Sequence, residues 1–289
     1  MKKLVIIIAA VLVLVFAILL ALPFVFKTKL VEAVKTSVNQ KINATVGFSE
    51  PKISLFRDFP KATIVLENVF VTGKGEFQGD TLFNAASLNA SMNLFSLLKS
   101  SGREIGKIVI DSPKLNLLVN AANKANWDIT FPENDGPATS EKVTAEPEKP
   151  FEIKLEKIEI RNGQLLYHDE SVTVNLALES INLDLAGKMY GAETALNVVG
   201  KAGNFRFEYD SVQYISNVAL ETKTLLAVNY ESMKIAIREN ELFVNRLPLQ
   251  ISGTIEMPAD SQIYDLQFEI ADNLPRQQHI TAYTTLLFL

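Results

Sequence analysis

Apolar and polar residues alternate over long stretches of this 289-residue chain. The clearest case is a set of even-numbered apolar positions between residues 81 and 94, namely Leu82, Ala86, Leu88, Ala90, Met92 and Leu94. The same alternation returns in residues 151–156, 205–210, 249–257 and 264–270. Successive side chains of a strand point to opposite faces, so each stretch predicts a strand with one dry and one wet face. One-sided strands are typical of antiparallel sheets.

An uncharged run of 23 residues, Leu4 to Phe26, precedes these strands. As a helix it is about 35 Å long, enough to cross a hydrocarbon core of about 30 Å. A cleaved signal peptide is the alternative, but cleavage needs small residues where this run ends in Pro23 and bulky neighbours. We therefore predict a transmembrane anchor at 1–27. The two-residue tail before it favours a body outside the cytoplasm.

The remaining chain divides by pattern. Residues 28–45 carry an apolar stripe at helical spacing and predict a juxtamembrane amphipathic helix. Two β regions are expected at 46–131 and 151–270. Residues 132–150, with four prolines and four glutamates, predict a disordered linker or loop between them. Residues 271–289 form an atypical tail.

The two β regions share an internal repeat. Ile105, Lys107, Ile108, Ile110 and Leu115 recur 50 residues later as Leu155, Lys157, Ile158, Ile160 and Leu165. Turn signals follow at the same place in each copy, at 111–113 and 161–163. The pattern predicts a strand that slips by one residue and then folds back in a hairpin. Either similar hairpins were added to one sheet, or β-propensity produced the likeness by chance.

Composition and charge exclude several classes of function. A net charge of −5 and a pI near 5.3 argue against a nucleic-acid-binding protein, because such proteins carry an excess of basic residues. The absence of cysteine removes disulfides, thiol catalysis and the common zinc sites. His168 is the best candidate for a general base, but it lies in a polar segment where we expect a turn. We expect no catalytic, cofactor or metal site, and interpret Trp127 as a core residue.

Several short motifs occur in a characteristic order. They are residues 54–62 (Ser-Leu-Phe-Arg-Asp-Phe-Pro-Lys-Ala), 66–71 (Leu-Glu-Asn-Val-Phe-Val), 80–83 (Asp-Thr-Leu-Phe), 94–98 (Leu-Phe-Ser-Leu-Leu), 108–113 (Ile-Val-Ile-Asp-Ser-Pro) and 126–129 (Asn-Trp-Asp-Ile). Together with the N-terminal run, they resemble the N-terminal region of the AsmA family of envelope proteins, in the form found in Bacteroidetes.

The resemblance implies a mainly β fold, in which a long curved antiparallel sheet forms a chorein-like groove. It also implies an inner-membrane anchor with a periplasmic body that binds phospholipid, or helps to transfer it toward the outer membrane. A closed sandwich or barrel is the alternative fold. The alternative function is a non-catalytic module that affects the targeting and assembly of outer-membrane proteins. Members of the family usually continue for several hundred residues, so an end at Leu289 predicts a truncated or frame-shifted chain.

The groove is expected to be lined by apolar positions of the strongest alternating stretches. They are Leu82, Leu88, Met92, Phe151, Ile153 and Leu155.

Overall fold

The computed structural model describes residues 31–32, 38–40, 42–58, 61–93, 103–129, 153–189, 193–229, 231–257 and 263–271. The predicted anchor at 1–27, the linker at 132–150 and nearly all of the tail at 271–289 lie outside these residues. No helix among the described residues has the length and apolar composition needed to cross a bilayer.

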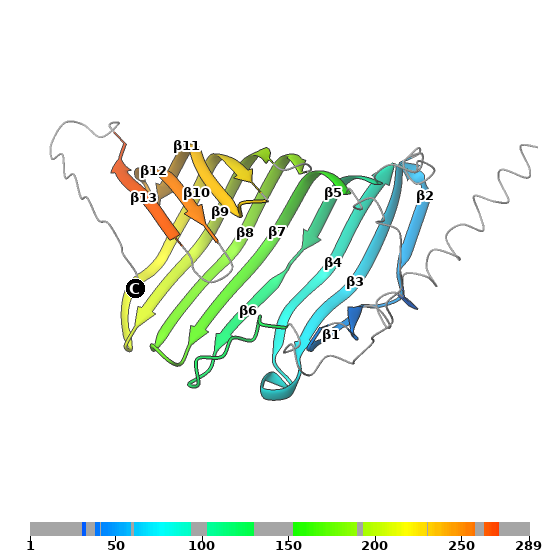
Figure 1. Ribbon diagram of the computed structural model, residues 1–289, viewed down its shortest axis with the longest axis horizontal. Helices are drawn as coiled ribbons and strands as arrows, with labels where there is room; N and C mark the ends of the chain where they lie inside the picture. Colours follow the sequence, from blue (N-terminus) through cyan, green and yellow to red (C-terminus); the bar gives the residue numbers. More distant parts are fainter. Residues whose placement is uncertain are drawn as a thin grey trace, which may run out of the picture.

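In the described part of the chain, thirteen strands form a single sheet (Figure 1). They are β1 (Ala44–Gly47), β2 (Lys52–Asp58), β3 (Lys61–Gly73), β4 (Thr81–Asn93), β5 (Arg103–Asp111), β6 (Lys114–Val119), β7 (Ile153–Asp169), β8 (Val174–Met189), β9 (Glu193–Tyr209), β10 (Val212–Asn229), β11 (Lys234–Val244), β12 (Leu247–Glu256) and β13 (Ile263–Ile270). A short 3-10 helix, η2 (Gly75–Phe77), lies between β3 and β4. The sheet order is β1-β3-β4-β5-β7-β8-β9-β10-β11-β12-β13, with β2 on β3, and β6 on β4 and β7.

The two ends of this order do not pair with each other. The described residues therefore form a long open sheet, as predicted, and not the closed sandwich or barrel. Both predicted β regions contribute to it, because β5 pairs with β7.

The helix predicted for residues 28–45 ends earlier than expected. Residues 31 and 32 are helical, but Ala44 and Thr45 belong to β1. The side-chain amide of Asn39 donates to the carbonyl of Val46 and accepts from its N–H, at 3.0 and 2.6 Å. An asparagine thus satisfies the outer edge of β1 while β3 satisfies the other edge.

An antiparallel sheet throughout was the wrong prediction, because β7 runs parallel to β5 and to β6. The two copies of the internal repeat are the segments that pair in parallel, and equivalent residues of the two copies are partners in the register. Residues 50 apart lie side by side, as Ile105 with Leu155, Ile108 with Ile158, Ile110 with Ile160 and Leu115 with Leu165. Parallel neighbours need a long crossover, and the chain between β6 and β7 is long enough for one. The predicted slip is also present, since the β7–β8 register shifts between Leu155 and Lys157.

The hairpin predicted at residues 161–163 does not form, because β7 continues through them to Asp169. Asn162 instead adopts a left-handed backbone conformation, with φ of 50°. Apolar residues occupy even positions before it (Ile158 and Ile160) and odd positions after it (Leu165 and Tyr167). One left-handed residue therefore keeps the apolar side chains of the strand on one face through a change of direction.

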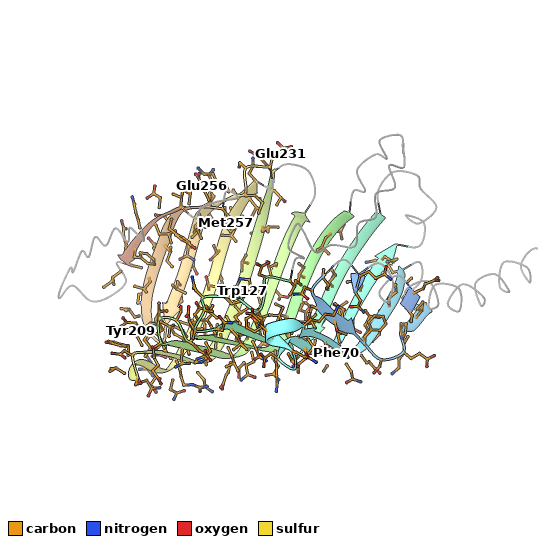
Figure 2. All side chains as sticks on the ribbon, turned by 60° about the horizontal axis from the view of Figure 1, so that its bottom comes forward. Phe70, Trp127, Tyr209, Glu231, Glu256 and Met257 are labelled. Atoms are coloured by element: carbon orange, nitrogen blue, oxygen red, sulfur yellow. The ribbon has the colours of Figure 1, made fainter. Side chains whose placement is uncertain are left out.

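Equivalent residues occur across the sheet. They are Asn68 in β3, Ser112 between β5 and β6, Ser180 in β8, Asn204 in β9 and Asn217 in β10, all with φ between 48° and 56°. Asparagine and serine are short and polar, and asparagine in particular tolerates this region better than most residues. The sheet bends along this line, and Figure 2 shows the strands curving between their upper and lower ends.

The bend closes toward the apolar face. In a straight strand, residues three apart are about 10 Å apart and point to opposite faces. Here a Cβ placed on Gly163 would lie 3.0 Å from Cγ2 of Ile160 and 3.3 Å from Cβ of Ile181. Apolar side chains on the two sides of Asn162 thus converge, which makes their face the concave one.

We expect Asn162→Val to destabilise the sheet by about 1–2 kcal/mol, because a β-branched residue is strained at positive φ. The stability of Asn162→Gly should stay within about 0.5 kcal/mol of wild type, since glycine adopts positive φ freely. Chemical denaturation of the full-length protein, followed by circular dichroism, measures both. Equal losses for the two variants would show that the backbone conformation is not what Asn162 supplies.

Candidate functional site

The concave face carries an uninterrupted row of uncharged residues across ten strands. Each pairs with the next in the register, from Leu66 through Leu88, Ile110, Ile160, Leu183, Gly200, Thr222, Leu242 and Leu249 to Ile270. At about 4.8 Å between strands, the row is about 43 Å long. A second row lies beside the first and runs from Ile64 through Ala90, Ile108, Ile158, Leu185 and Val198 to Thr224 and Asn240.

The polar side chains within these two rows occur toward one end and are neutral. Asn240 donates to Oγ1 of Thr224 at 2.6 Å and accepts from the N–H of Ile251 at 3.1 Å. It fills the gap in the β11–β12 ladder between Ile237 and Leu242. The polar atoms of this group thus bond to one another, and the face there remains uncharged.

Several apolar side chains at the β13 end of the face are exposed. Tyr264, Phe268 and Ile270 are 46%, 45% and 42% exposed. A sheet face packed against a second layer would bury such residues, so this end of the face is open to solvent.

The predicted lining residues are only partly brought together. Leu88 lies in the long row, and Met92 and Leu155 both pair with Ile105, so these three share the concave face. Leu82 lies where β4 loses register with β3 and is only 8% exposed, so it is a buried residue. Ile153 begins β7 opposite Arg103, and Phe151 lies outside the described residues.

Sequence reasoning missed most of the face, which continues through β8, β9 and β10. The signal was present as alternation, but the left-handed residue in each strand moves the apolar residues from one parity to the other. In β8 they change from Leu183 and Leu185 to Leu176 and Leu178 across Ser180. Because the apolar positions change parity at such a residue, the alternating pattern ends there, and the rest of the strand is not recognised as part of the same face.

Trp127 was also misplaced by the sequence interpretation, because its side chain is 42% exposed and not part of a core. Its ring lies 6.2 Å from the ring of Tyr167, centroid to centroid. Tyr167 pairs with Leu117 and Leu176 on the concave face, so Trp127 lies on that side of the sheet. Figure 2 labels it near the middle of the lower half.

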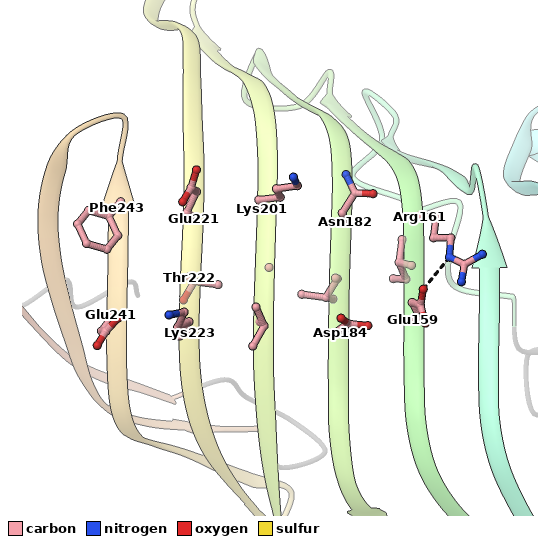
Figure 3. A pocket seen from close by; sticks show the side chains of 14 residues that line it. Glu159, Arg161, Asn182, Asp184, Lys201, Glu221, Thr222, Lys223, Glu241 and Phe243 are labelled. Carbon is pink, nitrogen blue, oxygen red and sulfur yellow. Dashed lines mark hydrogen bonds and ion pairs between the residues drawn. The ribbon is translucent and has the colours of Figure 1, made fainter.

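The opposite face is charged. It holds a depression of about 360 Å³ across β7 to β11, where side chains form two rows in Figure 3. One row holds Glu159, Asp184, Lys223 and Glu241, and the other holds Arg161, Asn182, Lys201, Glu221 and Phe243. Lysine stands opposite glutamate twice, as Lys201 with Glu221 and Lys223 with Glu241. Such cross-strand pairs each stabilise a sheet by about 0.2–1 kcal/mol.

Glu159 is the centre of an ion-pair network on this face. It pairs with Lys107 and accepts from Nε of Arg161 at 2.6 Å, while Lys157 lies 3.7 Å from it and 3.0 Å from Asp184. Hydrogen bonds from Lys107 and then Arg161 lower the pKa of Glu159 to about 2. The network links β5, β7 and β8, so side chains of the charged face help to hold these strands together.

His168 lies near the side chains of one asparagine and one glutamate. Its Nδ1 lies 2.5 Å from Oδ1 of Asn175, and its Nε2 lies 3.9 Å from Glu170. The side chain is exposed on the charged face, where it pairs across to β8. Within the described part of the chain, no three His, Cys, Asp or Glu side chains cluster to hold a metal ion.

Within the described residues, these features define an open, single-layer β-sheet with one concave apolar face and one charged face. The chain matches the model of the AsmA family over residues 1–240, and it belongs to that family. Family membership and the large β-sheet fit an envelope-associated protein. Comparisons with curated proteins and with solved structures found no match.

The charged face makes a prediction about acid stability. The folded pKa of Glu159 lies below its usual value, so its ion pairs stabilise the fold at neutral pH and are lost as pH falls from about 5 to about 2. Because Lys107 and Arg161 are partly exposed, we expect a loss of only about 1 kcal/mol. Glu159→Gln should be less stable than wild type at neutral pH and nearly equal to it at the acid end of this range.

Denaturation curves across this pH range measure the difference. Glu221→Gln is the matched control, because Glu221 lies in the same depression but is not a member of the Glu159 network. If Glu159→Gln and wild type lose stability in parallel on acidification, Glu159 does not carry the effect.

Proposed function

We propose that this protein holds phospholipid by its acyl chains on the concave apolar face. The observation that carries the proposal is the uncharged row from Leu66 to Ile270, which crosses ten strands. Most of its members are apolar and all remain partly or fully exposed, and an uncovered apolar surface of this extent is a mark of a binding surface.

The chemistry of the face suits an acyl chain. Covering apolar surface contributes up to about 0.8 kcal/mol for each methylene removed from water, without any directional contact. A hydrocarbon chain needs no hydrogen-bond partner, and the two rows of the concave face offer no charge. The charged neighbours of these rows in β7 to β11 lie on the other face, as in the depression around Glu159.

The location belongs to the same proposal. The uncharged run from Leu4 to Phe26 would anchor the chain in the inner membrane, with the sheet in the periplasm. The sheet would then receive phospholipid close to that membrane and help to move it toward the outer membrane. Membership of the AsmA family supports this placement. The role requires no catalytic group, cofactor or metal ion, and we propose that the protein is not an enzyme.

A second candidate is a non-catalytic module that affects the assembly of outer-membrane proteins. The observation that favours it is β13, which ends the sheet order without a further neighbour among the described residues. Its register with β12 is regular over eight pairs, and it contains neither proline nor lysine. Strands of this kind accept a strand from another chain. Crosslinking from β13 to a protein partner, without any bound lipid, would favour this candidate.

A matched pair of valines tests lipid binding. Val198 pairs with Leu185 and Thr224 on the concave face, whereas its neighbour Val199 pairs with Asp184 and Lys223 on the charged face. We expect Val198→Glu to lower uptake of a fluorescent phospholipid severalfold, because a carboxylate then stands among apolar groups. Val199→Glu should leave uptake unchanged.

The measurement uses the full-length protein, purified in detergent, delipidated and then titrated with the fluorescent lipid. Both variants keep the N-terminal run, so any lipid that adheres to it contributes equally. Circular dichroism confirms that both variants fold. Equal uptake by the two folded variants would refute binding on the concave face.

A further inference from the structure

The segment that carries Trp127 is fixed at several points. Lys124 pairs with Glu76 of η2, the N–H of Ala121 donates to Glu170 at 3.1 Å, and the N–H of Asn43 donates to the carbonyl of Ile129 at 2.7 Å. We call residues 120–129 the strap. It reaches from the β7–β8 turn to the start of β1 along the lower part of the sheet (Figure 1).

Asn126 holds the middle of the strap against β6. This side chain is only 3% exposed. It accepts from the N–H of Leu118 at 3.0 Å and donates to the carbonyl of Asn116 at 2.8 Å, while its own N–H donates to the carbonyl of Leu118. The residue after it, Trp127, is therefore presented from a fixed backbone.

Enclosure of the sheet is greatest around the strap. Most of the fully buried apolar residues lie in β1, β3, β4 and β6, at the end of the sheet that the strap crosses: Ala44, Val69, Leu82, Ala85 and Val119. Toward β13 the concave face is open, as the exposed Tyr264 and Phe268 show. Burial is thus greatest toward the β1 end of the sheet, and the exposed ring of Trp127 stands against Tyr167 of β7, between this buried region and the open one.

The charges next to Trp127 are already satisfied. The hydroxyl of Tyr167 donates to Asp169 at 2.8 Å, and that buried carboxylate also accepts from the N–H and the hydroxyl of Ser171. The ammonium of Lys124 pairs with Glu76. A phosphate group would find a buried carboxylate here and no free cation within the strap, whereas two aromatic faces suit a hydrocarbon. Charge complementarity therefore selects the acyl chain over the headgroup.

We propose that Trp127 and Tyr167 form an end-stop on the apolar face, against which the methyl end of a phospholipid acyl chain packs. The headgroup then lies away from the strap. This inference rests on the proposed function, because it orients the lipid that the face holds.

The test uses the intrinsic fluorescence of the chain, because Trp127 is its only tryptophan. The full-length protein, delipidated in detergent, is titrated with phosphatidylcholine brominated either near the ester or near the methyl end of its acyl chains. Bromine quenches tryptophan at short range. We expect a larger loss of Trp127 fluorescence with bromine near the methyl end than with bromine near the ester.

A relocated tryptophan is the control. Trp127→Phe combined with Val199→Trp moves the reporter to the charged face, where neither lipid should quench it beyond the level caused by detergent. Val198→Glu, with Trp127 in place, should lower the quenching by both lipids, because it removes the lipid from the face.

The outcomes separate the two proposals. If the fluorescent phospholipid binds in a manner sensitive to Val198→Glu but ester-end bromine quenches Trp127 as strongly as methyl-end bromine, the end-stop is wrong and the proposed function stands. If no phospholipid binds, the proposed function and the end-stop are both wrong. Trp127→Ala should also weaken lipid uptake more than Trp127→Phe, and equal uptake by these two variants would contradict the role of the ring.

Discussion

Neighbouring side chains of a strand point to opposite faces, and the structure depends on keeping that alternation in step across ten strands. A slip of one residue in any strand would move its apolar side chains to the charged face. The pairing of Leu66, Leu88, Ile110 and Ile160 shows that the apolar positions of four consecutive strands stay aligned, including the parallel pair β5 and β7. The concave face exists because each register places uncharged residues, most of them apolar, opposite one another.

Bending such a sheet presents a difficulty that the chain solves locally. A single left-handed residue, such as Asn162 in β7 or Ser180 in β8, turns the strand and shifts the parity of its apolar residues at the same point. Because these residues occur in successive strands, the bend becomes a continuous line. The apolar side chains remain on the inner side of it, where Ile160 approaches Gly163.

A single layer has few ways to bury apolar surface, and this sheet leaves part of its own exposed. The most enclosed region lies beside the strap, where Val69, Ala85 and Val119 are fully buried. Elsewhere the backbone ladders and the charged face hold the strands together, as the Glu159 network does for β5, β7 and β8. The concave face is therefore left without a second layer among the described residues.

Much of the fold could be predicted from local pattern. The strands from β4 onward and the one-residue slip before Lys157 follow from which residues alternate. The open sheet was implied only by the family resemblance, because one-sided strands fit a closed sandwich or barrel equally well. The parallel pairing could not be predicted, although its signal was visible as a repeat of 50 residues. A repeat shows that two segments are alike, but not that they lie side by side. The turn signal at Asn162 was equally ambiguous, because a left-handed residue serves a hairpin and a bent strand alike.

The candidate site shows the same limit. Leu88, Met92 and Leu155 lie on the concave face, each in a stretch of unbroken alternation, whereas the continuation through β8 to β10 was hidden by the change of parity. Leu82 was expected to line the groove but is buried, and Trp127 was expected in a core but is exposed. The sequence by itself determined that the strands have one apolar and one charged side, because side-chain alternation is a property of each strand alone. Only the tertiary structure decided which strands are neighbours, which way the sheet bends and which apolar residues stay uncovered, because these depend on contacts between residues far apart in the chain.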